Sequence, residues 1–107
     1  MFNDEFQKMT DKESQPSWWV YIIQTHNESY YTGITTDPTR RFMEHLQVYE
    51  GIKNAKGAKF FRSVKPIRII HQEAFANRSE ASKRERQIKK LNRTQKQQLV
   101  LNSKTDV

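Results

Sequence analysis

The chain is short, polar and basic. It has 107 residues, of which 35% are hydrophobic, and its 19 lysines and arginines outnumber its 12 acids to give a formal net charge of +7. This length fits one domain with a modest core. The absence of cysteine excludes disulfides and thiolate zinc sites, and the sequence has neither a membrane-spanning apolar run nor a signal-peptide pattern. We therefore expect a cytoplasmic protein with no membrane and no disulfide partner.

The charge is unevenly distributed along the chain. Residues 1–16 are net acidic and lack an apolar period, so we interpret them as a flexible N-terminal tail before a domain over 17–102 and a C-terminal tail over 103–107. Residues 83–96 contain seven basic residues and one acid. Such a run indicates either a polyanionic partner or an ordinary solvated helix face.

Two strands open the predicted domain. Aromatic and β-branched residues over 18–24 and 29–35, separated by a turn, predict a β-hairpin. If the turn centres on Asn27, alternation of side chains places four residues on one face of the hairpin: Tyr21, Ile23, Tyr31 and Gly33. Two phenols then lie beside a small open space above the glycine, although a single strand tyrosine is more often an ordinary core residue.

A helix follows the hairpin. Asp37 as N-cap and Pro38 at the first helical position predict a helix to about Tyr49. Its expected buried stripe is Phe42, Leu46 and Tyr49. Arg41 and His45 lie one turn apart beside that stripe and can reach one ligand. Taken singly, each residue is more often structural: Arg41 a surface arginine and His45 a half-buried histidine.

The second half of the chain adds one strand and two helices. The elements are a loop over 50–66, a strand over 67–73, a helix capped at Asn77 that runs to about Leu91, and a short helix capped at Thr94 that runs through Leu101. The order β-β-α-β-α-α predicts an α+β fold, with a small three-stranded antiparallel sheet flanked by helices.

Glu85 is the acid within the basic run. It lies at the edge of the inner face of the second predicted helix. One interpretation is local ion pairing with Arg84, Arg86 or Lys89. The other is a metal ligand, because a carboxylate on a phosphate-binding surface repels the ligand unless a divalent cation lies between them, and magnesium suits that position.

These residues, in this order and spacing, resemble the GIY-YIG nuclease superfamily: Tyr21, Tyr31-Thr32-Gly33, Arg41, His45 and Glu85. The resemblance covers about residues 18–91. Within the superfamily, the chain is similar to the small stand-alone bacterial members called YhbQ-like. The chain departs from the two family signatures at three positions. Trp19 and Val20 replace the glycine and isoleucine of the first signature, and Thr32 replaces the isoleucine of the second.

The resemblance implies a metal-dependent endonuclease that hydrolyses phosphodiester bonds in nucleic acid, with DNA favoured over RNA. It implies that Tyr21 activates the attacking water, Tyr31 positions water or phosphate, Arg41 stabilises charge on the phosphate and His45 assists proton transfer. Glu85 is then the ligand of a single divalent metal, Mg²⁺ or Mn²⁺. The residues expected to contact nucleic acid are Gly33, Lys56, Lys59, Arg62, Lys83, Arg84 and Lys89.

Two other functions remain open at this point. The same basic surface fits a module that binds nucleic acid without cutting it, in which Phe60 and Phe61 either stack on bases or pack in the core. The second alternative is a small interaction protein whose charge serves a partner subunit.

Overall fold

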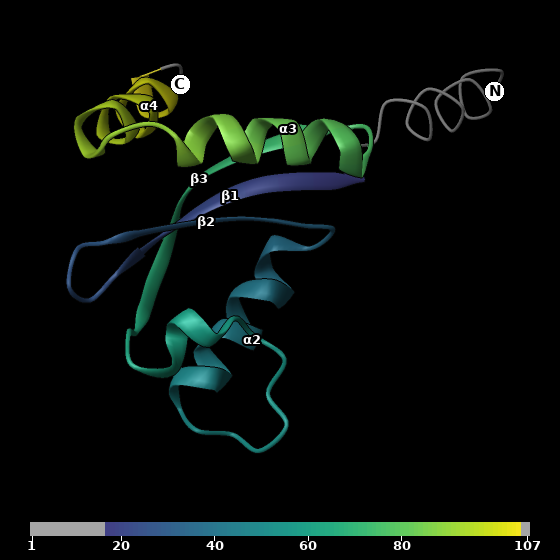
Figure 1. The fold of residues 1–107 in the computed structure, drawn as a ribbon, viewed down its shortest axis with the longest axis vertical. Helices are drawn as coiled ribbons and strands as arrows, with labels where there is room; N and C mark the ends of the chain where they lie inside the picture. Colours follow the sequence, from purple (N-terminus) through teal and green to yellow (C-terminus); the bar gives the residue numbers. More distant parts are fainter. Residues whose placement is uncertain (1–16, 106–107) are drawn as a thin grey trace, which may run out of the picture.

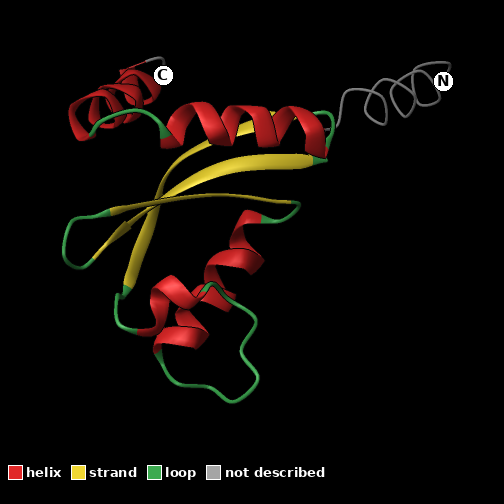
Figure 2. Cartoon of the chain, in the orientation of Figure 1, coloured by secondary structure: helices red, strands yellow, loops and turns green. Residues whose placement is uncertain are grey.

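The computed structural model describes residues 17–105, so the expected N-terminal tail over 1–16 lies outside the described residues. The elements are β1 (Trp18–Thr25), β2 (Tyr30–Thr35), α2 (Pro38–Tyr49), a 3-10 helix η1 (Lys59–Arg62), β3 (Pro66–Phe75), α3 (Arg78–Lys89) and α4 (Arg93–Thr105) (Figure 1). The strands form one antiparallel sheet in the order β2-β1-β3, as Figure 2 shows. The predicted α+β class with a three-stranded antiparallel sheet is confirmed. Within the described residues, no helix is long and apolar enough to cross a membrane.

The β1–β2 hairpin has the register that the sequence predicted. It pairs Tyr21 with Gly33 and Ile23 with Tyr31. Side chains in the turn fix this register. The Thr25 hydroxyl donates to Asn27 Oδ1 at 2.6 Å, and the Ser29 backbone N–H donates to Thr25 Oγ1 at 3.0 Å. The turn therefore fixes which residues share a face.

The two faces of the sheet carry separate apolar clusters, because β1 is the central strand and its side chains alternate. Val20 and Ile22 face α3 and α4, and they form a buried cluster with Ala81, Ile88 and Val100. Tyr21 and Ile23 face the opposite side and cluster with Phe61 of η1. Figure 1 shows α3 on one side of the sheet and α2 on the other.

Side-chain caps explain where the helices begin. Asp37 accepts the Arg40 N–H at 3.1 Å at the start of α2. Asn77 caps α3 by accepting the Glu80 N–H at 3.0 Å, as the sequence predicted. For α4 the predicted cap at Thr94 is wrong. Asn92 is the cap: its side chain accepts the Gln95 N–H at 2.8 Å, and the Gln95 side chain accepts the Asn92 N–H at 2.9 Å. The helix also continues past Leu101 to Thr105.

The buried face of α2 differs from the predicted stripe of Phe42, Leu46 and Tyr49. His45 is the fully buried residue of this helix, whereas Tyr49 is 39% exposed. The cause is the segment that follows α2, which returns along it. At Gly57 an added Cβ would lie 2.4 Å from the Glu44 carbonyl oxygen, so only glycine permits this approach. The returning segment and η1 then cover His45 and rotate the buried side of the helix toward it.

Candidate active site

Tyr21 lies across Gly33 at the centre of the site. A Cβ added to Gly33 would meet the Tyr21 hydroxyl oxygen at 2.6 Å and Cζ at 2.8 Å. The small open space predicted above the glycine is therefore wrong, because the Tyr21 ring fills it. Glycine is needed here for close approach of the phenol, since any side chain would displace it. The Tyr21 ring itself is only 2% exposed.

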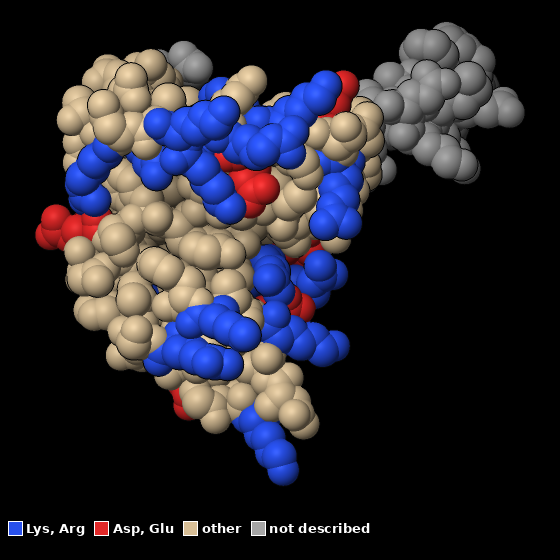
Figure 3. Space-filling view, in the orientation of Figure 1, with Lys and Arg blue, Asp and Glu red and all other residues tan. Residues whose placement is uncertain are grey.

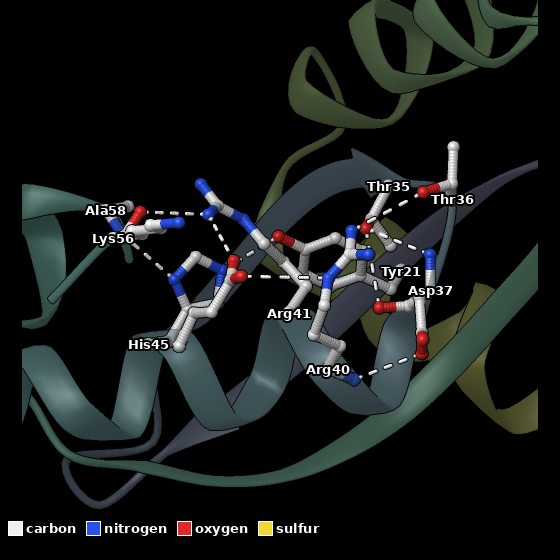
Figure 4. Close-up of polar contacts among 10 residues, drawn as sticks. Tyr21, Thr35, Thr36, Asp37, Arg40, Arg41, His45, Lys56 and Ala58 are labelled. Carbon is white, nitrogen blue, oxygen red and sulfur yellow. Dashed lines mark hydrogen bonds and ion pairs between the residues drawn. The ribbon is translucent and has the colours of Figure 1, made fainter.

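His45 holds the Tyr21 hydroxyl from α2 (Figure 4). Its Nε2 lies 2.8 Å from the phenol oxygen, and its Nδ1 accepts the Ala58 backbone N–H at 3.0 Å. An Nδ1 that accepts a hydrogen bond carries no proton, so in the neutral ring the proton is on Nε2. His45 therefore donates to Tyr21. Its tautomer is set by the backbone of the segment that covers it.

The electrostatics of this pair agree with that assignment. Burial, followed by the nearby Arg41 guanidinium, lowers the pKa of His45 to about 4, so the ring is neutral at pH 7. Burial also raises the pKa of Tyr21, and the Tyr31 phenol adds to this, while Arg41 acts in the opposite direction. The resting site therefore holds a protonated phenol whose oxygen accepts from a neutral imidazole.

Arg41 is fixed by two acceptors. Its Nη1 donates to Glu44 Oε1 at 2.8 Å and to the Lys56 carbonyl oxygen at 2.9 Å. Burial alone would lower the pKa of Arg41, but the bonds to Glu44 and the Tyr21 phenol raise it. The side chain keeps 29% of its surface exposed. It is thus a permanently charged group, pre-positioned beside Tyr21 and open to a ligand.

Tyr31 lies in an aromatic cluster next to Tyr21. Its ring centroid is 5.3 Å from His45 in an edge-on arrangement and 4.9 Å from Phe61. Phe60 lies 5.3 Å away on the more exposed side and is itself 41% exposed. Phe61 is fully buried, so it is a core residue and not a base-stacking residue. Burial raises the pKa of Tyr31, and Arg41 and Lys89 oppose that rise.

Glu85 comes to the site from α3, on the other side of the sheet. Its charge acts on both phenols, raising the pKa of Tyr21 and of Tyr31 after the larger effect of burial. Its direct partner is Lys89, whose Nζ lies 3.0 Å from Oε2 in an i,i+4 pair. Lys89 is one of the three ion-pair partners that the sequence predicted for Glu85.

The donor set around Glu85 decides which metal ions fit. Residues 17–105 contain no group of three or more histidine, cysteine or acidic side chains able to hold a metal. A structural zinc site is therefore excluded for these residues. Magnesium takes one or two carboxylates and completes its shell with water and substrate phosphate. One half-buried carboxylate can fit Mg²⁺ or Mn²⁺ in that way.

The other predicted contacts to nucleic acid divide into two groups. Lys56, Lys59 and Arg62 come from the segment after α2, and Lys83 and Lys89 come from α3. Figure 3 shows lysines and arginines gathered over these two parts, with an uncharged area between them. Arg84 belongs to neither group, because its guanidinium is bound to Glu73 at 2.8 and 3.1 Å.

Three contacts of the site were missed from the sequence: the Ala58 N–H, the Lys56 carbonyl and the Glu44 carboxylate. The first two depend on how the segment over 50–58 returns to α2, and backbone contacts leave no compositional pattern. The third is an i,i+3 pair within α2. Gly57 was the available signal. It stands in the Gly-Ala-Lys sequence and permits the close approach that delivers Ala58 to His45.

Comparison with known proteins identifies the family of this chain. The model of the GIY-YIG catalytic domain matches residues 17–98. A UPF0213 protein of Cupriavidus necator is 49% identical over 80 residues, covering 75% of this chain and 79% of that protein. A UPF0213 protein of Desulfotalea psychrophila is 45% identical over 86 residues, covering 80% and 73%. The solution NMR structure of protein EF2693 from E. faecalis superposes with a TM-score of 0.55 at 35% identity, covering 87% and 92%. The chain therefore belongs to the GIY-YIG nuclease superfamily, in its group of small UPF0213, or YhbQ-like, proteins.

Proposed function

We propose that this protein is a metal-dependent endonuclease that hydrolyses phosphodiester bonds in nucleic acid, with DNA as the favoured substrate. The supporting observation is the Tyr21–His45 pair, in which a buried phenol oxygen accepts from a neutral imidazole and lies beside a fixed, partly exposed arginine. A simple binding surface has no need of such an arrangement.

Each side chain has a distinct task in this proposal. Arg41 binds the scissile phosphate and stabilises the negative charge that develops on its oxygens. Tyr21 first loses its phenol proton to water and then, as the phenolate, accepts the proton of the attacking water. The Nε2–H of His45 stabilises that phenolate, which makes His45 a hydrogen-bond donor and not a second base. Tyr31 positions the water or the phosphate from the neighbouring strand.

Glu85 is the residue proposed to hold the divalent ion, Mg²⁺ or Mn²⁺. When bound, the ion supplies positive charge to the phosphate and its leaving oxygen. In the structure the Glu85 carboxylate pairs with Lys89 at 3.0 Å. Lys89 is free to contact a phosphate once the pair opens.

The decisive experiment is Glu85→Gln, measured for cleavage and for binding. We expect cleavage of DNA in Mg²⁺ or Mn²⁺ to fall by orders of magnitude, while binding in chelator stays level or improves because a repulsive charge is removed. Glu80→Gln is the matched control, since Glu80 is an exposed acid in the first turn of the same helix.

The alternative function is binding without cleavage. This alternative is supported if the wild-type protein binds nucleic acid but cuts nothing in any divalent metal, and if Glu85→Gln changes only stability. Cleavage that survives in chelator would instead contradict the metal dependence.

A further inference from the structure

A cationic pocket adjoins the catalytic cluster, which is formed by Tyr21, Arg41 and His45. This shallow pocket of about 250 Å³ lies where β2 leads into α2 and α3 begins. The residues of this pocket that matter here are Trp18, Thr36, Arg40, Arg41, Glu44 and Arg78. Figure 3 shows basic side chains over this end of the sheet.

The pocket is strongly cationic because three arginines share one carboxylate. Glu44 contacts Arg41 at 2.8 Å and Arg40 at 3.6 Å. Arg78 comes from a different helix, and no carboxylate within residues 17–105 contacts it. Among residues 17–105, two positive charges therefore remain without a carboxylate partner around one small volume, an arrangement that favours an anion.

Trp18 holds Arg78 in place. The Arg78 guanidinium carbon lies 5.3 Å from the centre of the Trp18 ring. A guanidinium over an aromatic ring uses its face for that contact and keeps the N–H groups at its edge for other acceptors. Those N–H groups form a planar fork that matches two oxygens of a phosphate. The stacking also limits the motion that Arg78 must lose on binding.

The pocket is continuous with the catalytic cluster. Arg41 lines both, and Glu44 contacts Arg41 in the cluster and Arg40 in the pocket. A strand with its scissile phosphate at Tyr21 and Arg41 therefore brings a neighbouring phosphate toward Arg40 and Arg78. A mononucleotide could not occupy both positions.

We infer that this pocket binds a phosphate of the nucleic-acid strand next to the scissile phosphodiester, with Arg78 as its principal ligand and Trp18 as the residue that positions it. The inference rests on the proposed nuclease function and deepens it, because it makes the enzyme act on a strand that continues past the cut. Trp18 serves as a support for Arg78, not as a base-stacking platform.

The test is binding of Arg78→Gln to a short fluorescent DNA oligonucleotide in chelator, over a series of salt concentrations. We expect weaker binding and a salt slope reduced by about 0.7 for single-stranded DNA or about 0.9 for duplex, the loss of one phosphate contact. Arg78→Lys keeps the charge but not the fork, so affinity should fall while the slope stays close to the wild-type value.

Arg93→Gln is the matched control. Arg93 also lies over an aromatic ring, at 4.8 Å from the centre of Tyr30, but at the opposite end of β2. We expect this variant to keep the wild-type salt slope.

A second measurement locates the contact. Oligonucleotides with one uncharged methylphosphonate linkage, scanned by position, should show one linkage whose neutralisation weakens wild-type binding but not Arg78→Gln binding. If Arg78→Gln keeps the wild-type slope and the same position sensitivity, the subsite is overturned while the proposed catalysis stands. If the slope falls as expected but nothing is cleaved in any metal, the subsite stands and the proposed catalysis fails.

Discussion

Each face of the sheet buries one histidine between two polar partners, and the two sites differ in charge. On the α2 face, His45 lies between the Tyr21 hydroxyl and a backbone N–H. On the α3 and α4 face, His71 Nε2 lies 2.7 Å from Glu73 Oε2, and its Nδ1 lies 2.7 Å from the Ser103 hydroxyl. The first histidine has a cationic neighbour and no bonded acid, whereas the second is bonded to a carboxylate.

The difference shows that residue types alone do not identify a catalytic site. Ser103, His71 and Glu73 have the composition of a hydrolytic triad. Yet the Glu73 carboxylate is also bound by Arg84 through two bonds, and the Ser103 hydroxyl lies 3.3 Å from the Leu99 carbonyl in its own helix. This network joins β3 to α3 and α4. The Tyr21 site, by contrast, has a partly exposed Arg41 and a phenol that can exchange its proton.

Tyr21 is the residue whose replacement should reduce cleavage most. We expect Tyr21→Phe to lower the cleavage rate by about 10²–10⁴-fold, because it removes the proton acceptor. The lost bond to His45 should reduce the free energy of unfolding by only about 1–2 kcal/mol. Cleavage kinetics and urea unfolding measure the two effects. Tyr30→Phe, on the other face, is the control and should cut at the wild-type rate.

The pH dependence of stability separates the two faces. The pKa of His45 falls from 6.5 to about 4 on folding, so the unfolded chain binds more protons and stability falls as the pH drops from 6.5 to 4. Hydrogen bonds from His71 and Arg84 lower the pKa of Glu73 from 4.5 to about 2. The stability that the ionised Glu73 contributes is therefore present above pH 4.5 and lost toward pH 2. Each change is at most about 3 kcal/mol.

Denaturant unfolding at a series of pH values measures these windows. His45→Gln should flatten the upper one and Glu73→Gln the lower one. Stability that is level from pH 6.5 to 4 in the wild-type protein would contradict the burial of a neutral His45.

Glu73→Gln also tests the structural role of the second network at neutral pH. It removes the charge that binds both His71 and Arg84, and we expect a loss of about 1–3 kcal/mol in the free energy of unfolding. Cleavage by the folded variant should be unchanged. A large loss of cleavage in folded Glu73→Gln would mean that this face takes part in catalysis.

The smallest expected effect is at Thr32. Its hydroxyl is buried on the α3 side of β2 and has no hydrogen-bond partner within the described residues. Thr32→Val has nearly the same shape without the unpaired hydroxyl, so we expect a gain of up to about 1 kcal/mol in stability. Thermal unfolding measures it, and cleavage should not change. A destabilised variant would show that the hydroxyl has a partner, such as a buried water.

Local patterns in the sequence determined the elements and their register. Alternation around the turn at Asn27 paired Tyr21 with Gly33, and short polar side chains at Asp37 and Asn77 placed the starts of two helices. The order of tyrosines, Arg41, His45 and Glu85 was sufficient to indicate the family. All of these depend on residues close together in the chain, whose spacing is fixed by the geometry of strands and helices.

Only the tertiary structure decided how those residues meet. The return of residues 50–58 along α2 buried His45 in place of Tyr49 and, through the Ala58 N–H, put the imidazole proton on Nε2. The approach of β3 to α3 neutralised Arg84 and removed it from the basic surface. These contacts join segments 11 to 13 residues apart through backbone groups and long side chains. Such groups occur in every sequence, so composition and periodicity do not reveal which of them will pair.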